Sequence, residues 1–128
     1  MHEVVIAGAA RTAIGSFQGA FAATDAATLG GAAIRAALAD AGAAPAAVEE
    51  LLMGCVLPAG QGQAPARQAG FLAGLSEDVP ATTINKMCGS GMKAAIMARD
   101  RIALGEAGVM VAGGMESMTN APYLLPKM

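Results

Sequence analysis

The feature that most constrains the fold is an alternation, along 128 residues, between short apolar runs and segments with helical periodicity. Each apolar run is bounded by glycine, proline or polar residues, which is typical of a buried strand. Each segment between two runs repeats its apolar residues at helical spacing. The predicted strands cover residues 4–9, 51–57, 80–85 and 109–114, and the predicted helices cover residues 28–41, 65–73 and 89–104.

Strands that alternate with helices predict a mostly parallel sheet, because each helix returns the chain to the same end of the sheet. The apolar runs are continuous, so we expect helices on both faces of that sheet. Gly42, Gly74 and Gly105 follow the three helices, and Pro65 begins the second. A chain of this length forms one α/β domain at most. Residues 11–24 are expected to be a loop, and residues 115–128 show no clear element.

Composition excludes several classes of protein. The chain is 55% hydrophobic and 14% charged, so it is not a disordered chain. The net charge is −2 and the cations are scattered, so we expect no nucleic-acid partner. No apolar stretch reaches the length of a membrane span, and no signal peptide is visible, so we expect no membrane partner. Two cysteines and one histidine predict neither a disulfide scaffold nor a metal site, and favour a reduced, cytoplasmic protein.

The segment that carries chemistry is Asn85-Lys86-Met87-Cys88-Gly89-Ser90-Gly91, where a predicted strand meets a predicted helix. Reactive groups collect at the carboxyl ends of parallel strands. A helix N-terminus favours a thiolate over a thiol, and its N–H groups can hold an oxyanion. Cys88 is therefore a candidate nucleophile. Gly89, Ser90 and Gly91 would form the turn and helix start that position it, with the glycines supplying the sharp turn and room for a substrate.

Two other interpretations of this segment stay open at the level of the residues. Cys88 fits equally well as a small hydrophobic residue buried in the core. Residues 89–94 also match the G-x-G-x-x-A pattern of a dinucleotide-binding loop, with Glu116 after the next strand. Against that pattern, the match falls on the third predicted strand, whereas a dinucleotide-binding fold normally carries it on the first.

Other candidate residues give weaker signals. Cys55 lies inside an apolar run, where packing is the expected role. Glu116 is expected to be a solvated loop residue, with a buried hydrogen-bonding role as the alternative. His2 is expected at the surface, and Gly113-Gly114 in a turn or a close backbone approach. Six methionines are expected mostly to fill the core: Met87, Met92, Met97, Met110, Met115 and Met118.

Several motifs, taken in order, resemble those of the N-terminal part of the thiolase family. They lie at residues 4–6, 10–17, 53–57, 62–68, 85–91 and 113–118. Their combination is specific, although each motif alone is not. The resemblance implies a thiolase-like N-terminal half-domain over residues 1–128, without the C-terminal half and most of the loop region.

The resemblance implies that Cys88 takes an acyl group from an acyl-CoA as a thioester and transfers it to acetyl-CoA or CoA. This is the Claisen condensation or thiolysis of an acetyl-CoA C-acetyltransferase, in fatty acid metabolism. Coenzyme A thioesters are the substrates, and no further cofactor or metal is implied. Members of the family assemble as homo-oligomers, either dimers or tetramers.

The resemblance also shows what the chain lacks. In the family, the second half supplies a histidine that activates the nucleophile and a second cysteine that acts as a base. Here the single histidine is His2, and no cysteine follows Cys88. We therefore expect a fragment or truncated gene product that is inactive in turnover on its own, and poorly soluble or oligomeric. The alternative from a different class is a non-catalytic assembly remnant.

Overall fold

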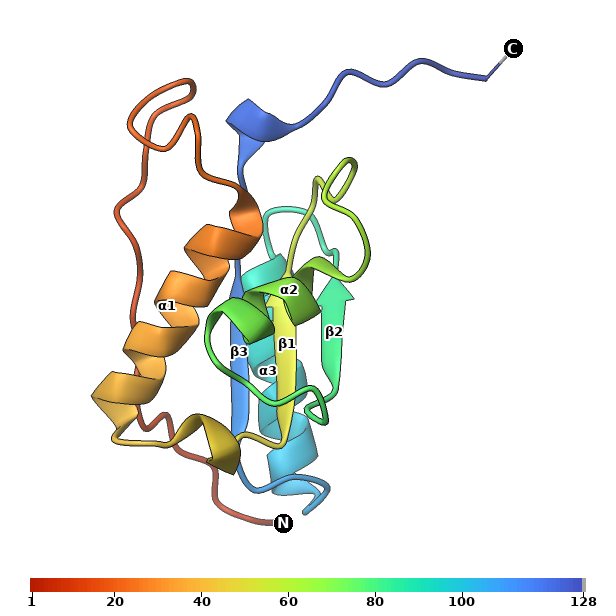
Figure 1. The fold of residues 1–128 in the computed structure, drawn as a ribbon. Helices are drawn as coiled ribbons and strands as arrows, with labels where there is room; N and C mark the ends of the chain where they lie inside the picture. The colour runs from red at the N-terminus through yellow and green to blue at the C-terminus, as the bar shows by residue number, and fades with distance from the viewer. Residues whose placement is uncertain (128) are drawn as a thin grey trace.

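The sheet has three parallel strands in the order β2-β1-β3. Strand β1 (Glu50–Gly54) lies between β2 (Ala81–Ile84) and β3 (Met110–Gly114). The structure is a computed structural model and describes residues 1–127. The last residues of the three strands are in register. The chain therefore leaves all three strands at one common edge, here called the carboxyl edge, which is uppermost in Figure 1.

Helices cover both faces of the sheet, as the continuous apolar runs predict. Helices α1 (Ala26–Ala41) and α2 (Pro65–Leu72) pack on one face, and α3 (Ser90–Ala103) packs on the other (Figure 1). Successive residues of a strand point to opposite faces. Leu51 accordingly joins the core cluster beneath α1 and α2, whereas Leu52 joins the cluster beneath α3. The predicted α/β architecture is confirmed.

The helix ends follow the signals in the sequence. The Asp25 carboxylate accepts a hydrogen bond from the Thr28 N–H at 2.7 Å, so α1 begins two residues before the predicted start. Gly42 ends α1 with a φ of 63°. Gly74 and Gly105, just beyond α2 and α3, have φ values of 88° and 77°, a region that favours glycine. Two short 3₁₀ helices complete the chain, at Pro45–Ala47 and Met118–Asn120.

The predicted strand at residues 4–9 is wrong. The Ala9 N–H donates to the Asp40 carboxylate of α1 at 3.0 Å, and the side chains of Val5 and Ile6 are 72% and 88% exposed. A strand needs a neighbour for its backbone groups, and within residues 1–127 no strand pairs with this segment. The apolar run therefore has the composition of a strand, but no neighbouring strand of the described residues forms hydrogen bonds with its backbone. The second predicted strand is also shorter than expected and ends at Gly54.

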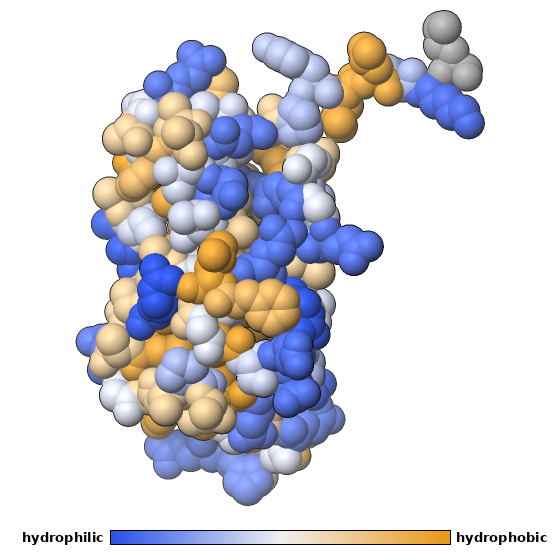
Figure 2. All heavy atoms as spheres, in the orientation of Figure 1, coloured by the Kyte–Doolittle hydropathy of each residue, from blue (hydrophilic) through white to orange (hydrophobic). Residues whose placement is uncertain are grey.

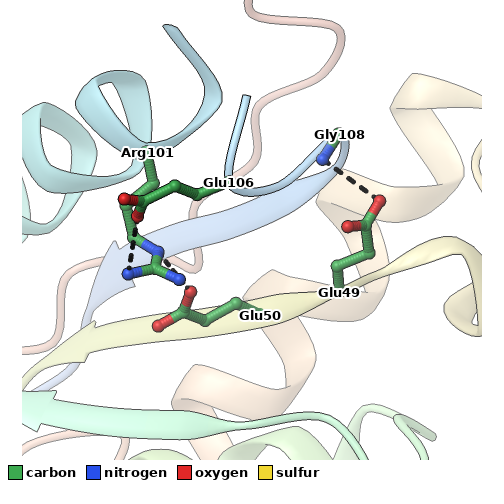
Figure 3. A network of polar contacts seen from close by, with 5 residues as sticks. All are labelled: Glu49, Glu50, Arg101, Glu106 and Gly108. Carbon is green, nitrogen blue, oxygen red and sulfur yellow. Dashed lines mark hydrogen bonds and ion pairs between the residues drawn. The ribbon is translucent and has the colours of Figure 1, made fainter. Parts of the chain in front are cut away.

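A polar network joins the elements at the opposite edge of the sheet (Figure 3). Arg101, near the end of α3, forms ion pairs with Glu50 of β1 at 2.7 Å and with Glu106 at 3.1 Å. The Gly108 N–H donates to the Glu49 carboxylate at 3.1 Å. These contacts hold the end of α3 against the starts of β1 and β3, far from the carboxyl edge.

Large apolar side chains remain at the surface. Figure 2 shows apolar atoms over the face that carries α1 and α2, and along the C-terminal tail. Met87, Met92 and Met118 are exposed, contrary to the predicted core role, whereas Met115 is buried. Met92 lies on the side of α3 that faces away from the sheet, so no layer of the described residues covers it. None of the helices in residues 1–127 is long and apolar enough to cross a membrane.

Candidate active site

Cys88 lies at the carboxyl edge, in the turn that connects β2 to α3, as the sequence predicts. Its side chain is exposed, which excludes the interpretation of Cys88 as a buried packing residue. The thiol stands immediately before the first turn of α3, where a helix presents backbone N–H groups without partners inside the helix. The arrangement leaves an accessible sulfur atom beside groups that can stabilise negative charge.

The hydroxyl of Ser90 holds this turn together. It accepts a hydrogen bond from the Lys86 N–H at 2.8 Å and donates one to the Met87 carbonyl at 2.6 Å. Ser90 is 5% exposed, and among residues 1–127 it is the one polar residue that is buried. The Gly89 N–H also donates to the Lys86 carbonyl at 3.1 Å. Ser90 therefore joins the residues on the N-terminal side of Cys88 to the start of α3.

The sharp bend is made by Met87, and the expectation that Gly89 and Gly91 supply it is wrong. Met87 has a φ of 49°, a left-handed conformation that costs a residue with a side chain about 1 kcal/mol or more. Gly89 has a φ of −90°, and Gly91 is already part of α3. Asn85 stabilises the bend because its Oδ1 accepts the Met87 N–H at 2.9 Å.

The first turn of α3 sits directly on the backbone of β1 and β3. A methyl group at Gly54 would lie 2.6 Å from Ser90 Cβ, and one at Gly114 would lie 3.4 Å from Gly91 Cα. The predicted close backbone approach at Gly113-Gly114 is thus confirmed. These contacts place the backbone of Gly91 against β3, where it packs between the helix and the sheet.

This packing predicts different effects when a methyl group is added to the strand side or to the helix side of the contact. Gly54→Ala is expected to destabilise the fold by about 1–3 kcal/mol, because the added methyl overpacks against Ser90. Gly91→Ala is the matched control: its methyl would come no closer than 3.6 Å to its neighbours, and alanine favours a helix. Urea denaturation of both variants measures the difference. Equal stability for the two would contradict the close approach.

Glu116 forms hydrogen bonds inside the structure, as the alternative prediction has it. The expectation of a solvated loop residue is wrong. Its carboxylate accepts hydrogen bonds from the N–H groups of Val56 and Leu57 at 2.9 and 3.0 Å. The Cys55 thiol lies 3.6 Å from the same carboxylate and accepts a hydrogen bond from Gln61 Nε2 at 3.5 Å. The sequence hinted at this role only through the position of Glu116, just beyond a strand and two glycines.

Cys55 is buried, as predicted, whereas Cys88 is exposed. Burial first, and the negative charge of Glu116 second, raise the pKa of the Cys55 thiol above its ordinary value. Cys55 therefore stays protonated and donates its S–H to the Glu116 carboxylate. A protonated, buried thiol is a poor nucleophile, so Cys55 does not compete with Cys88 for an electrophile.

The hydrogen bonds of Ser90 predict that the loss of its hydroxyl lowers the stability of the fold. Ser90→Ala is expected to lose about 1–3 kcal/mol of stability, because two part-buried hydrogen bonds are lost, one from the Lys86 N–H and one to the Met87 carbonyl. Ser76→Ala is the control, since the Ser76 hydroxyl forms its contacts with Asp78 at an exposed position. Thermal unfolding followed by circular dichroism measures the effect. If Ser90→Ala melts like the control, the hydroxyl does not hold the turn.

Other groups that often take part in catalysis lie elsewhere. His2 is exposed, as predicted, and its backbone N–H donates to the Ala103 carbonyl at the far end of α3. A helix of this length places it about 20 Å from the turn that carries Cys88. Among residues 1–127, no three His, Cys, Asp or Glu side chains are grouped so that they could hold a metal ion.

Comparisons with known proteins agree with one another. The model of a family described as thiolase, N-terminal domain, matches residues 4–128. A mitochondrial acetyl-CoA acetyltransferase B of Xenopus laevis is 54% identical over 99% of this chain, and an acetyl-CoA acetyltransferase of Cupriavidus necator is 54% identical over 98%. The chain covers 30% and 32% of these two proteins, so it spans about a third of their length.

A solved structure shows the same fold. The crystal structure of a thiolase from Ascaris suum in complex with coenzyme A superimposes with a TM-score of 0.94 and 38% sequence identity. The match covers 96% of this chain and 32% of that one.

Proposed function

The chain belongs to the thiolase family, and on that premise we propose that it is the part of an acyl-CoA acyltransferase that carries the nucleophile, Cys88. The observation that supports this most directly is the exposed thiol at the carboxyl edge, immediately before the N-terminus of α3. Gly89, Ser90 and Gly91 follow Cys88 and position it: Ser90 by its two hydrogen bonds, Gly89 by the hydrogen bond of its N–H to the Lys86 carbonyl, and Gly91 by the contact of its backbone with Gly114.

The proposed step is a transthioesterification. The Cys88 sulfur attacks the carbonyl carbon of an acyl-CoA, and a tetrahedral intermediate forms with the negative charge on oxygen. N–H groups at the start of α3 are suited to stabilise that oxygen. The bond between the acyl carbon and the CoA sulfur then breaks, and the proton of the Cys88 thiol ends on the CoA sulfur. A thiolate is both a good nucleophile and a good leaving group, so Cys88 can accept and release an acyl group.

We propose coenzyme A thioesters as substrates because the similar thiolase structure is a complex with coenzyme A. The acyl group on Cys88 would pass to acetyl-CoA in a Claisen condensation or to CoA in thiolysis, and fatty acid metabolism uses both directions. The relatives are named acetyl-CoA acetyltransferases. No additional cofactor enters this proposal.

We also propose a cellular compartment and a state of assembly for the protein. Cys88 needs a reducing compartment to remain a free thiol, which fits the cytoplasm; among the relatives, one is named mitochondrial and another is bacterial. The exposed apolar side chains favour self-association, in line with the homo-oligomers of the family.

Intact mass spectrometry after brief exposure to acetyl-CoA tests the function. The chain is expected to gain the mass of one acetyl group, on the peptide that contains Cys88. Neutral hydroxylamine should remove that group, because it cleaves thioesters and leaves lysine amides intact. A chain that gains no labile acetyl group would favour the non-catalytic remnant instead.

The dinucleotide-binding alternative has its own test. A pyrophosphate bound by Gly89 and Gly91 would need their backbone to be open, whereas Gly91 packs against Gly113 and Gly114. Titration with NADH is therefore expected to leave both the thermal stability of the chain and the acetylation of Cys88 unchanged. A saturable shift in the melting temperature would support the alternative.

A further inference from the structure

We propose that Glu116 is a positioning residue for Cys88, which it reaches through Val56 and Asn85; this inference rests on the proposed role of Cys88 as nucleophile. Glu116 follows β3 at the carboxyl edge, and its half-buried carboxylate reaches across to the segment that follows β1. There it accepts the N–H groups of Val56 and Leu57 at 2.9 and 3.0 Å. One side chain thus fixes the start of the neighbouring loop.

The loop in turn contacts the turn that carries the nucleophile. The Val56 carbonyl accepts a hydrogen bond from Asn85 Nδ2 at 3.5 Å. The other end of the same amide, Asn85 Oδ1, accepts the Met87 N–H at 2.9 Å. Asn85 therefore lies between the loop after β1 and the residue that precedes Cys88. Its orientation depends on where the Val56 carbonyl is held.

The conformation of Met87 explains why this support matters. A left-handed φ in a residue with a side chain persists only where its surroundings fix it. Ser90 holds the Met87 carbonyl from the helix side, and Asn85 holds the Met87 N–H from the loop side. Without the loop-side support, Met87 can relax, and the turn that holds Cys88 next to the start of α3 then changes its conformation.

The chemistry of the contact requires a carboxylate. Glu116 presents two oxygen atoms, and each accepts a different backbone N–H. A glutamine of the same shape has one oxygen, so its NH₂ group would face one of these donors. Glu116→Gln therefore removes part of the support while it keeps the volume of the side chain. Glu106→Gln makes the same chemical change at the opposite edge of the sheet and serves as the control.

The test measures amide hydrogen exchange and two reactions of Cys88 in the parent chain and both variants. In Glu116→Gln, the Val56 and Leu57 amides are expected to exchange about tenfold faster, and the Met87 amide should also exchange faster by a few-fold or more. The rate of acetylation at saturating acetyl-CoA is expected to fall by about tenfold. Alkylation of Cys88 by iodoacetamide, which needs no fixed alignment, should stay within about twofold of the parent. Glu106→Gln should match the parent in every measurement.

The outcomes separate this proposal from the proposed function. If Val56 and Leu57 exchange faster but Met87 does not, Glu116 fixes only its own loop and the proposal is overturned. If the parent chain is never acetylated, the proposed function fails, and Met87 exchange still decides whether Glu116 supports the turn. Should Glu116→Gln not fold, Asn85→Ala interrupts the same path at an exposed residue and must produce the same changes at Met87 and Cys88.

Discussion

Cys88→Ala is expected to abolish the hydroxylamine-labile acetyl group that acetyl-CoA leaves on the parent chain. The reason is that Cys88 is the exposed cysteine of the described residues and lies at the start of α3, whereas Cys55 is buried. The fold should survive, because an exposed side chain contributes little packing. Intact mass and the melting temperature, measured on the same samples, check both statements.

Cys55→Ala provides the matched control for this loss. Cys55 is buried, and burial together with Glu116 raises the pKa of its thiol, so it is expected to take no acyl group in the parent chain. Cys55→Ala should therefore keep the full acetyl increment, even if it lowers stability by the modest cost of a smaller core residue. An acetyl group that persists in Cys88→Ala and disappears in Cys55→Ala would contradict the prediction, because it would identify Cys55 as the nucleophile.

The architecture could be predicted where the sequence pattern is local. The positions of Pro65, Gly42 and Gly105 determine where helices begin and end, and the structure agrees at each. Strand pairing is not local, which is why the predicted strand at residues 4–9 is wrong. Its apolar, β-branched composition predicts a strand, but a strand exists only beside another strand. The same lack of partners explains the exposed side chains of Val5 and Ile6.

The candidate site shows the same division. The place of Cys88 between a strand and a helix followed from the order of the elements. The residue that makes the bend did not, because glycine is the usual choice for a positive φ and here it is Met87. A buried hydrogen-bonding role for Glu116 is one of two alternatives in the sequence, but its partners could not be predicted, since Val56 and Leu57 lie about sixty residues away in the sequence. Only the register of β1 and β3 brings them together.

Steady thiolysis of acetoacetyl-CoA by this chain is expected to be slower than that of a full-length relative by at least about 10²-fold, the usual contribution of a general base. The single histidine, His2, lies at the far end of α3 from Cys88. A base must come within hydrogen-bond reach of the proton that it takes. Acylation should therefore stop after one acetyl group per chain, while the loss of acetoacetyl-CoA stays near the uncatalysed rate.

The comparison is made with purified chain, CoA and acetoacetyl-CoA, with a full-length acetyltransferase relative as the positive control and Cys88→Ala as the negative one. Activity that remains in Cys88→Ala comes from a contaminating enzyme. Activity that depends on Cys88 and lies within about tenfold of the full-length relative would contradict the prediction, because a general base contributes more than that. It would mean that a group of this chain other than His2 takes the proton.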